Sequence, residues 1–544
     1  MPAPRKENKV SRRSFLQGSM LVVAGSILAA CQPSSRPTTA PTSAPAAPGS
    51  VAAATAVPPT AAPPTAAKSG GKLTVGTVGD ISNLDPFMMV AVNYPMMETV
   101  YDQFVRLTND LKLQPAIVEE WTPSADGLQL KLKVRRGVKY HDGSTATADD
   151  VAKCIQRAMV AETGGHMYAN WQSAQEVVAT GNDSVLVTLK KPTAYLLPAM
   201  GFTSLIRPSA FSDLKKTDGG TGPFKVKEWV PNDYVDFERF GDYYVSGKPK
   251  LDSVRLKIYA DPAPMIVALE AGTLDMTLSV PPSEYERLKA KLNIVKGQDA
   301  ANFYYFAMNT KKPPFDKKEV RQALAFAIDK VSMCKNVLFS ISDPIDLPWP
   351  KGSLGYFQEL EGRYKFDLGE AKKRLAAAGL PNGFEFKMQY QTTYPEFGQM
   401  AQIMAASLAQ IGVRATLVPM DGPSFTNLYM QGDGYEATFL FAGGTQWFPT
   451  RIAASTAFRL VNNVCWPNGI PPKEYADGIT ACDSTLDPTA QREAMRKVAT
   501  SFVEECWAVP VAFRYDLFGL QKYVQGFGYG VFDQPRYHDV VLSK

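Results

Sequence analysis

A proline-rich segment near the N-terminus limits where this 544-residue chain can fold. Residues 32 to 70 contain nine prolines among Ala, Thr and Ser, and no aromatic residue. Such a composition cannot bury enough apolar surface to form a core, and its prolines favour an extended backbone. We therefore expect a stalk there and a folded body from Lys72 onward. The remaining length suits two or three domains.

The segment before this stalk has the layout of an export signal. A basic start leads into a 13-residue apolar core, Gly18 to Ala30, which is too short for a stable membrane span. Arg12 and Arg13, within SRRSFLQ, resemble the twin-arginine export signal, and a plain Sec signal is the alternative. The residues Leu-Ala-Ala before Cys31 resemble a lipobox. We predict that Cys31 is lipidated and anchors an extracytoplasmic protein to the outer face of the cytoplasmic membrane, or else that the protein lies in the periplasm.

The composition argues against several classes of protein. A net charge of +5 on this length is small, and no Lys and Arg run is interleaved with aromatic residues, so nucleic acid is not expected as a partner. No later apolar stretch is long enough to span a membrane. Cys465 and Cys482 could pair in an oxidising compartment, whereas Cys506 continues an apolar helix face and is expected in the core.

Strand and helix patterns alternate through the body of the chain. Residues 72–78 and the alternating LQLKLKV at 128–134 read as strands, and Thr147 with Asp150 forms a capping-box pattern that opens a helix. Residues 319–330 have apolar positions at helical spacing.

Four later segments continue this alternation. Strands are expected at 383–390, 413–419, 435–443 and 508–514, with helices between them. The fold class is therefore α/β, with helices on both faces of a sheet. Ligands of such sheets bind beyond the carboxyl ends of the strands.

Four segments carry a family pattern in the order expected for that family. They resemble signature segments of the family 5 extracytoplasmic solute-binding proteins, which feed peptides, nickel, haem or oligosaccharides to ABC importers. The resemblance runs from Lys72 to the end of the chain, and its four segments are residues 113–151, 220–254, 307–330 and 366–386.

The resemblance implies a two-lobed fold of the periplasmic-binding-protein type II, with an extra subdomain in lobe I. Lobe I would comprise residues 72–302 plus 511–544, with the extra subdomain at about 106–218, and lobe II would comprise 303–510. The two crossings between the lobes would form a hinge. By resemblance, a solute closes the lobes of a monomer, and the permease subunits of the importer recognise the closed form.

Little in the sequence favours catalysis. The three histidines are His141 in a tight turn, His166 in a Gly-rich loop and His538 near the C-terminus, where we expect a surface position. There is no GxSxG motif and no cluster with metal-ligand spacing, so no cofactor, metal or catalytic residue is predicted. A secreted glycan hydrolase is the alternative from another class, and it would need two carboxylates about 5 to 9.5 Å apart in a cleft.

Five stretches match ligand-facing regions of the family. For each single aromatic residue, core packing is an equal alternative, except for Trp447, which follows two glycines beyond a strand and is favoured as a ligand contact. The candidate ligand-binding residues are Asn93, Tyr94, Phe303, Tyr305, Tyr390, Gln446, Trp447 and Arg514.

One departure from the family bears on the solute. Peptide-binding relatives commonly hold an aspartate near this tryptophan, where it pairs with the ligand's ammonium, but no carboxylate lies between Glu436 and Thr450. A buried ammonium without a counter-ion costs several kcal/mol. A peptide remains the first expectation, and an oligosaccharide or another neutral or cationic organic solute is the alternative.

Overall fold

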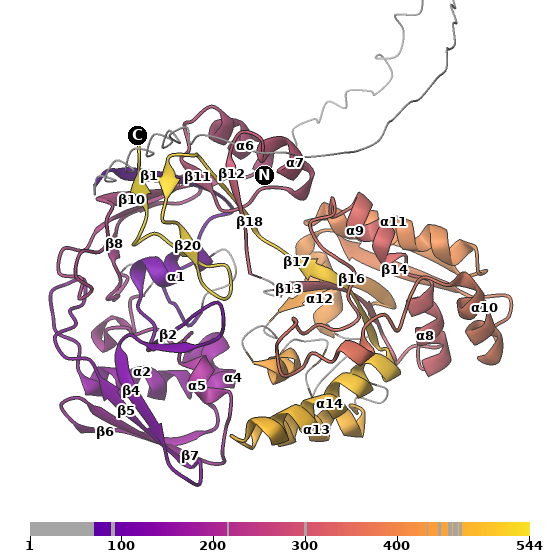
Figure 1. Cartoon of the computed structure of the whole chain (residues 1–544), viewed down its shortest axis with the longest axis horizontal. Coiled ribbons are helices and arrows are strands. Elements are labelled where there is room, and N and C mark those ends of the chain that lie inside the picture. The colour runs from indigo at the N-terminus through magenta and orange to yellow at the C-terminus, as the bar shows by residue number, and fades with distance from the viewer. Residues whose placement is uncertain are drawn as a thin grey trace, which may run out of the picture. The chain divides into compact units, whose positions relative to one another are not determined.

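The structure is a computed structural model that describes residues 70–88, 93–214, 217–298, 302–431, 434–443, 448–454, 458, 460, 466 and 470–544. Within these ranges, none of the helices combines the length and the apolar character that crossing a bilayer requires. The export signal and the stalk, and with them Arg12, Arg13 and Cys31, lie outside the described residues. The mixed α/β architecture in Figure 1 agrees with the predicted fold class.

A seven-stranded sheet forms the first lobe. Its order is β12-β18-β11-β1-β10-β9-β8, in which β1 runs parallel to β10 and β11 and the other pairs are antiparallel. The expected strand at 72–78 is β1, residue for residue. The strands are β1 (Lys72–Val78), β8 (Phe224–Val230), β9 (Tyr234–Arg239), β10 (Ser253–Tyr259), β11 (Met276–Thr277), β12 (Asn293–Lys296) and β18 (Leu517–Leu520).

Short helices and hairpins complete this lobe. Helix α6 (Pro262–Glu270) begins after Asp261 with proline at its first position, and Gly272, with a φ of +73°, follows its end. Met265, Ile266 and Leu269 of α6 form a small apolar core with Leu517 of β18. The other elements are α1 (Tyr94–Val100), α7 (Tyr285–Leu288), and the paired strands β19 (Val524–Gln525) with β22 (Val541–Leu542) and β20 (Gly528–Tyr529) with β21 (Pro535–Arg536).

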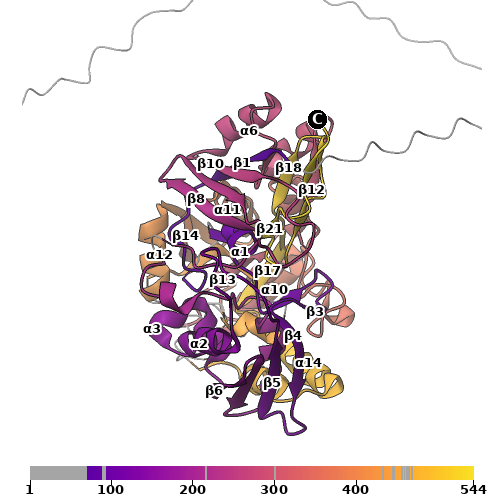
Figure 2. The same cartoon turned by 90° about the vertical axis from the view of Figure 1, so that its left-hand side faces the viewer.

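An additional four-stranded antiparallel sheet, in the order β4-β5-β7-β6, lies between β1 and β8 in the chain. In β5 the apolar residues of the alternating sequence are buried and the lysines are exposed, as the period-two pattern predicts. Helix α2 (Ala148–Ala158) packs beside this sheet in Figures 1 and 2, and Thr147 and Asp150 make the predicted capping box. The elements are β2 (Val105–Leu107), β3 (Leu113–Pro115), β4 (Val118–Pro123), β5 (Gln129–Val134), β6 (Ala174–Gly181), β7 (Ser184–Leu189), α3 (Ala161–Gly164), α4 (Tyr168–Trp171) and α5 (Leu196–Ala199).

A five-stranded sheet forms the second lobe, in the order β15-β14-β16-β13-β17. Strand β14 is parallel to β15 and β16, whereas β13 is antiparallel to both of its neighbours, β16 and β17. The strands are β13 (Asn302–Met308), β14 (Glu385–Gln391), β15 (Arg414–Met420), β16 (Ala437–Gly443) and β17 (Ala508–Arg514).

The helices of the second lobe differ from the sequence prediction at one place. The single helix expected at 319–330 is wrong, because α8 stops at Phe326 and Asp329 caps a new helix by accepting a hydrogen bond from the Ser332 N–H at 2.9 Å. A side-chain cap competes with continuation of the helix. The helices are α8 (Lys318–Phe326), α9 (Lys330–Asn336), α10 (Leu368–Ala377), α11 (Pro395–Ala409), α12 (Gly422–Gln431), α13 (Lys473–Asp483) and α14 (Pro488–Glu505).

The chain passes between the two large sheets twice. The first crossing joins Lys296 of β12 to Asn302 of β13. Because β17 extends to Arg514, the second crossing consists of Tyr515 and Asp516, somewhat later than the expected position near 510. The two crossings contact each other, since the Gly297 N–H donates to the Asp516 carbonyl oxygen at 2.8 Å.

Four cysteines are free thiols buried in the protein, namely Cys154, Cys334, Cys482 and Cys506. Burial of Cys506 confirms its predicted place in the core. Cys482 forms no disulfide with a described residue, and Cys465, its suggested partner, lies outside the described residues. Burial raises the pKa of the Cys482 thiol to about 12, which makes the thiol unreactive.

Candidate functional site

The carboxyl edge of the five-stranded sheet brings together strand ends that are far apart in the sequence. Asn302, the first residue of β13, pairs with Gly443 at the end of β16 and with Arg514 at the end of β17. Strands β14 and β15 end at the same edge, because β14 runs parallel to β16. The predicted residues Tyr390 and Arg514 therefore share one edge, as expected for an α/β ligand site.

Arg514 is the cation of this edge. Its Nη1 lies 3.0 Å from Oδ1 of Asp516, and its guanidinium carbon lies 5.4 Å from the centroid of the Phe441 ring. The nearby Asp516 carboxylate raises the pKa of Arg514 further, although burial opposes this shift. The Arg514 side chain is 25% exposed, so part of the guanidinium can still meet a solute.

Three tyrosines lie on the side of the sheet covered by α11, and two of them, Tyr304 and Tyr394, are close enough to Arg514 to affect its pKa. The Tyr304 hydroxyl donates to Oε1 of Glu396 at 3.0 Å, and the Tyr394 ring packs edge-on against Phe441 with centroids 5.1 Å apart. The predicted residue Tyr390 is half-buried, and its ring lies so close to Gly398 that a Cβ there would be 2.9 Å from the ring. The edge therefore offers aromatic faces beside one carboxylate and one guanidinium.

The first lobe contributes aromatic and acidic side chains to this region. The predicted residue Tyr94 opens α1, and its ring lies 6.0 Å from that of Phe532, which in turn lies 4.7 Å from Phe202. Burial, together with the charge of Asp516, raises the pKa of Tyr94 to about 12, so its hydroxyl stays protonated at neutral pH. Tyr94 thus presents a hydrogen-bond donor close to the second crossing.

Asp533 is the most strongly perturbed acid of this region. Its side chain is 5% exposed, and Oδ1 accepts a hydrogen bond from the Gln298 N–H at 2.6 Å. Oδ2 is buried and has no hydrogen-bond partner among the residues that the structure describes. Burial and then the charge of Asp516 raise the pKa of Asp533 to about 8. At neutral pH this carboxyl group therefore holds its proton.

We call Arg514, Asp516, Asp533, Glu396 and Tyr94 the hinge cluster. Asp516 connects its members, because it pairs with Arg514 and shifts the pKa values of Tyr94 and Asp533. Arg514 is thus paired with Asp516, and its charge is also coupled to Glu396 and Asp533. Such an arrangement can recognise a solute with a cationic group, since acid is in excess of base.

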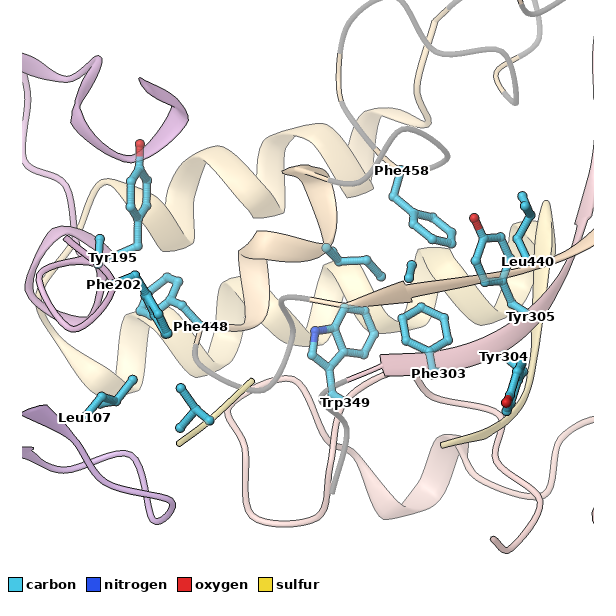
Figure 3. Packing of buried hydrophobic residues seen from close by; sticks show 14 of the residues in the cluster. Leu107, Tyr195, Phe202, Phe303, Tyr304, Tyr305, Trp349, Leu440, Phe448 and Phe458 are labelled. Atoms are coloured by element: carbon cyan, nitrogen blue, oxygen red, sulfur yellow. The ribbon is translucent and has the colours of Figure 1, made fainter. Parts of the chain in front are cut away.

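Two predicted residues lie on the opposite face of the same sheet. Phe303 and Tyr305 are fully buried, with ring centroids 5.5 Å apart, and both rings lie against Phe458. Figure 3 shows this group beside Trp349, with Tyr304 pointing the other way. The pair therefore supports the sheet from its packed face, and a ligand contact for either residue stays a prediction.

Asn93 supports the start of α1. Its amide donates to the Asn83 carbonyl oxygen at 2.8 Å and accepts from the Ser82 hydroxyl at 2.8 Å, and the side chain is fully buried. These bonds fix the position of the neighbouring Tyr94. The remaining predicted contacts, Gln446 and Trp447, lie outside the described residues.

A second contact, which we call the subdomain contact, joins the four-stranded-sheet region to the second lobe. Figure 3 shows Tyr195 next to Phe448, with ring centroids 6.3 Å apart. The Arg451 guanidinium lies 3.7 Å from the Tyr195 ring and pairs with Asp483 at 3.2 Å. The Asp483 carbonyl oxygen also accepts a hydrogen bond from the Ala194 N–H at 2.9 Å.

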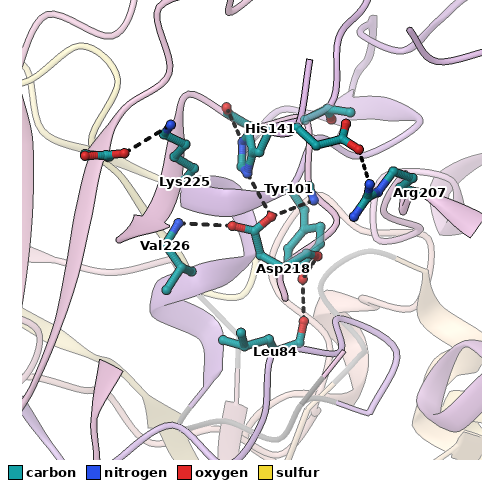
Figure 4. A network of polar contacts seen from close by, with 12 residues as sticks. Leu84, Tyr101, His141, Arg207, Asp218, Lys225 and Val226 are labelled. Atoms are coloured by element: carbon teal, nitrogen blue, oxygen red, sulfur yellow. Dashed lines mark hydrogen bonds and ion pairs between the residues drawn. The ribbon is translucent and has the colours of Figure 1, made fainter. Parts of the chain in front are cut away.

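The histidines form no ligand site in the part of the chain that the structure describes. His141 lies between the Asp218 carboxylate, 2.9 Å from Nδ1, and the Gly222 carbonyl oxygen, 3.0 Å from Nε2 (Figure 4). Asp218 also accepts hydrogen bonds from the backbone N–H groups of Gly220 and Val226. Although burial alone would raise it, the bond from His141 and these N–H groups lower the pKa of Asp218. This network joins the extra sheet region to β8.

The remaining observations on the site concern His538 and possible metal ligands. The expected surface position of His538 is wrong, because the side chain is 6% exposed and packs near Glu98 and Arg106 in the first lobe. Among the described residues, His, Cys, Asp and Glu side chains form no group that could hold a metal ion.

The carboxylates of the hinge cluster were not among the ligand contacts predicted from the sequence. Asp516 was within its reach, because it lies two residues after the predicted Arg514 at the end of a predicted strand. Glu396 and Asp533 gave no comparable signal, since one opens a helix and the other lies in a hairpin far along the chain. Only the tertiary fold brings these three acids together.

Comparison with known proteins places the chain among binding proteins. A family described as "Bacterial extracellular solute-binding proteins, family 5 Middle" matches residues 112–463. The glutathione-binding protein GsiB of Escherichia coli O1:K1 / APEC is 26% identical over 455 residues, which cover 79% of this chain and 86% of the relative. GsiB of E. coli strain K12 is 25% identical over 454 residues, with the same coverage.

Solved structures share the fold at lower identity. AgaA of A. tumefaciens R10, in complex with agropinic acid, has a TM-score of 0.75 at 23% identity and covers 87% of this chain and 99% of its own. AppA of Bacillus subtilis, in complex with a nonapeptide, has a TM-score of 0.75 at 20% identity, with coverage of 88% and 100%. DppA of Helicobacter pylori, in complex with the peptide STSA, has a TM-score of 0.74 at 22% identity, with coverage of 88% and 99%. These likenesses confirm the two-lobed fold.

Proposed function

From the premise that this chain belongs to the bacterial extracellular solute-binding proteins of family 5, we propose that it captures a small peptide and delivers it to the permease of an ABC importer. Membership of this family makes the chain an extracytoplasmic binding protein and not an enzyme, which excludes the hydrolase alternative. The single observation that carries the peptide proposal is the hinge cluster, where Arg514 and three carboxyl groups lie within one site.

A zwitterionic solute fits this cluster better than a neutral one. Arg514 is suited to a carboxylate, and Asp516 and Glu396 are suited to an ammonium group. The relatives named as glutathione-binding proteins, and AppA and DppA with their bound peptides, support a peptide by analogy. The missing carboxylate between Glu436 and Thr450 therefore does not argue against a peptide, because other segments supply acidic groups at the same edge.

A non-peptide organic solute is the second candidate. AgaA, which has the same fold, is in complex with agropinic acid, so the fold also accommodates an opine. The aromatic residues of the carboxyl edge, Tyr390, Tyr394 and Phe441, offer flat faces to such a solute. An oligosaccharide would use these faces and leave the charged groups without partners, which favours a charged solute over a sugar.

We propose that the solute binds at the carboxyl edge and closes the two lobes. The two crossings, at 297–301 and at Tyr515 and Asp516, would act as the hinge, with lobe I formed by residues 72–296 and 517–544 and its extra subdomain at about 106–218. A ligand shifts the population toward the closed form only if it contacts both lobes. Tyr94 in one lobe and Arg514 in the other lie close enough to Asp516 to make such contacts.

The other predicted ligand contacts belong to this proposal. Trp447 and Gln446 follow β16 in the sequence, and we propose that the indole ring provides an apolar face for the solute. Phe303, Tyr305 and Asn93 would act by supporting the site. The protein would work as a monomer.

We also propose that lipidated Cys31 holds the protein at the membrane. The lipobox-like residues before Cys31, the twin-arginine-like pair Arg12 and Arg13 and the proline-rich stalk support this proposal. Replacement of Cys31 by Ser should release the protein from the membrane fraction. Tight association of the Cys31→Ser variant would contradict lipidation.

Thermal unfolding in the presence of candidate solutes tests the proposed function. A panel of glutathione, dipeptides and tripeptides is compared with neutral oligosaccharides. A bound solute at about 100 times its Kd should stabilise the protein by about 2.7 kcal/mol, and it should be recovered unchanged. Stabilisation by oligosaccharides alone would contradict peptide capture, and conversion of any solute would contradict a binding role.

A further inference from the structure

Resting on the proposed function, we propose that Asp516 and Asp533 form a cation subsite at the hinge, which accepts an ammonium or guanidinium group of the solute in exchange for a proton. The solute at this subsite therefore carries a positive charge, and Asp533 is the protein group that responds to it.

Asp533 is built into the hinge and is not a surface acid. It lies in the hairpin between β20 and β21 with a φ of +58°, and its N–H donates to the Gly530 carbonyl oxygen at 2.9 Å. Its carboxylate approaches Gly297 so closely that a Cβ there would lie 2.6 Å from it. Glycine at 297 is therefore needed for the acid to reach the first crossing, where Gln298 binds Oδ1.

Asp516, in the second crossing, contacts the first crossing at Gly297, next to the residue that binds Asp533. Its carbonyl oxygen accepts the Gly297 N–H, and its carboxylate pairs with Arg514 through Oδ1. Its side chain is 31% exposed, so this acid can be reached from solvent. The subsite therefore has a solvent-accessible acid, Asp516, whose charge acts on the buried Asp533, and Oδ2 of Asp533 has no partner within the described ranges.

Among the residues that the structure describes, the charges around the subsite do not balance. Arg514 is the cation that shifts the pKa of Asp533, while Asp516 and Glu396 add negative charge to the cluster. Lys296 is directed elsewhere, since its ammonium lies 3.5 Å from the Tyr515 ring and donates to the Ile341 carbonyl oxygen at 3.0 Å. The other titratable groups of the cluster are the phenols of Tyr94, Tyr304 and Tyr394, which are neutral at pH 7 because burial raises their pKa values.

A buried carboxylate without a counter-ion is costly, and holding a proton removes that cost. Burial and the charge of Asp516 raise the pKa of Asp533 to about 8, which agrees with this role for the proton. An incoming ammonium group can do the same by donating an N–H to Oδ2. The Asp533 proton then passes to the buffer, so charge at the subsite is conserved while the solute replaces the proton.

Isothermal titration calorimetry with matched peptides tests this exchange. The probes are Ala-Ala-Ala, N-acetyl-Ala-Ala-Ala and N-acetyl-Ala-Lys-Ala, each titrated in buffers with different ionisation enthalpies. A free ammonium should bind about 30-fold or more tightly than its acetylated counterpart, because only the ammonium can pair with Asp516 and replace the proton of Asp533. At pH 7 its binding should release close to one proton, and at a pH well above 8 none.

The acetylated lysine peptide identifies the source of the charge. If it binds like Ala-Ala-Ala, the subsite takes a side-chain ammonium, and if it binds like the neutral probe, the subsite takes the amino terminus. Either result supports a cation subsite, provided that one of the two cationic probes shows the preference and the proton release.

Asp533→Asn is the decisive variant, because asparagine tolerates the positive φ and keeps an oxygen for the Gln298 N–H. It should abolish proton release and reduce the preference for the free ammonium to a few-fold. Asp516→Asn is the second variant, with the same expected loss of preference. Asp242→Asn, whose carboxylate pairs with Lys139 and is 56% exposed, is the matched control and should change neither quantity.

Two outcomes overturn the proposal, and they are distinguishable. If all three peptides bind with similar affinity and without proton release, the cation subsite is wrong but peptide capture stands. If no peptide binds while another solute does, the proposed function fails and the subsite built on it fails as well. Proton release that persists in Asp533→Asn would likewise contradict the assignment to Asp533.

Discussion

The hinge cluster and the subdomain contact both link the two lobes, but their charges differ. At the subdomain contact, Arg451 pairs with Asp483, and the Tyr195 ring covers the guanidinium. At the hinge cluster, three carboxyl groups share one guanidinium, and Oδ2 of Asp533 has no partner among the described residues. In the subdomain contact the cation is paired with a carboxylate. In the hinge cluster the carboxyl groups outnumber the cation, so a proton or a ligand must neutralise the excess negative charge. We therefore expect the subdomain contact to give structural support, and we have proposed that the hinge cluster recognises the solute.

Arg451→Ala should give the largest effect, because it breaks the balanced contact. Asp483 would remain mostly buried without its cation, and its pKa is already raised by burial. We expect the free energy of unfolding to fall by about 3 kcal/mol, measured by urea denaturation. In the control Arg414→Ala, the ion pair with Glu385 is 78% and 72% exposed, so almost no change is expected. Equal losses in both variants would refute the structural role of the subdomain contact.

The pH dependence of the free energy of unfolding should reveal the proton that Asp533 holds in the hinge cluster. Since burial and Asp516 raise the pKa of Asp533 to about 8, the folded protein holds a proton that the unfolded chain has lost above about pH 4. This proton stabilises the folded protein fully at low pH. The stabilisation decreases as the pH rises from about 4 and is lost once the pH has passed through about 8. The unfolding free energy should fall with a slope approaching about 1.4 kcal/mol per pH unit.

Denaturation of wild type and Asp533→Asn between about pH 6 and 8 measures this slope. The window avoids most of the titration of Asp102, whose pKa burial raises to about 6. The variant should show a correspondingly flatter profile. Parallel profiles for the two proteins would show that Asp533 does not carry the proton.

Trp447→Ala tests whether the indole ring of Trp447 contacts the solute. If the indole faces the solute, the variant should bind it more weakly by about 1 kcal/mol or more and unfold at the same denaturant concentration. If it is instead a core residue, stability should fall by about 3 to 5 kcal/mol. Parallel calorimetry and denaturation decide between the two.

Tyr195→Ala should have the smallest effect. It removes an aromatic ring that contacts Arg451 and Phe448, so the contact between the two regions should weaken by about 0.5 to 1 kcal/mol. Ligand affinity should drop a few-fold, measured by calorimetry. Tyr195→Phe keeps the ring and is the matched control, and a similar loss in that variant would point to the hydroxyl group instead.

Much of the fold was predictable because its signals are local. The strands β1 and β17 match their predicted ranges, and the capping box of α2 forms as expected, since alternation and capping depend on neighbouring residues. The helix at 319–330 was predicted too long, because the apolar spacing continues past Asp329 while the cap at Asp329 ends the helix. His538 was misplaced because burial of a polar residue depends on the packing around it.

The candidate site was only half predictable. The resemblance to ligand-facing stretches of the family pointed to Tyr390 and Arg514, which share the carboxyl edge. It could not find Glu396 and Asp533, because their segments meet the edge only after the lobes have folded and the crossings have paired. The inference from the absence of a local carboxylate was therefore too narrow, since it considered a single segment of the chain.

The most direct test of peptide capture is native mass spectrometry of the protein purified from its host, followed by identification of the released solute. The account predicts a peptide that carries a free ammonium or guanidinium group, bound one to one. A neutral oligosaccharide as the bound solute, with no cationic group for Asp516 and Asp533, would contradict it.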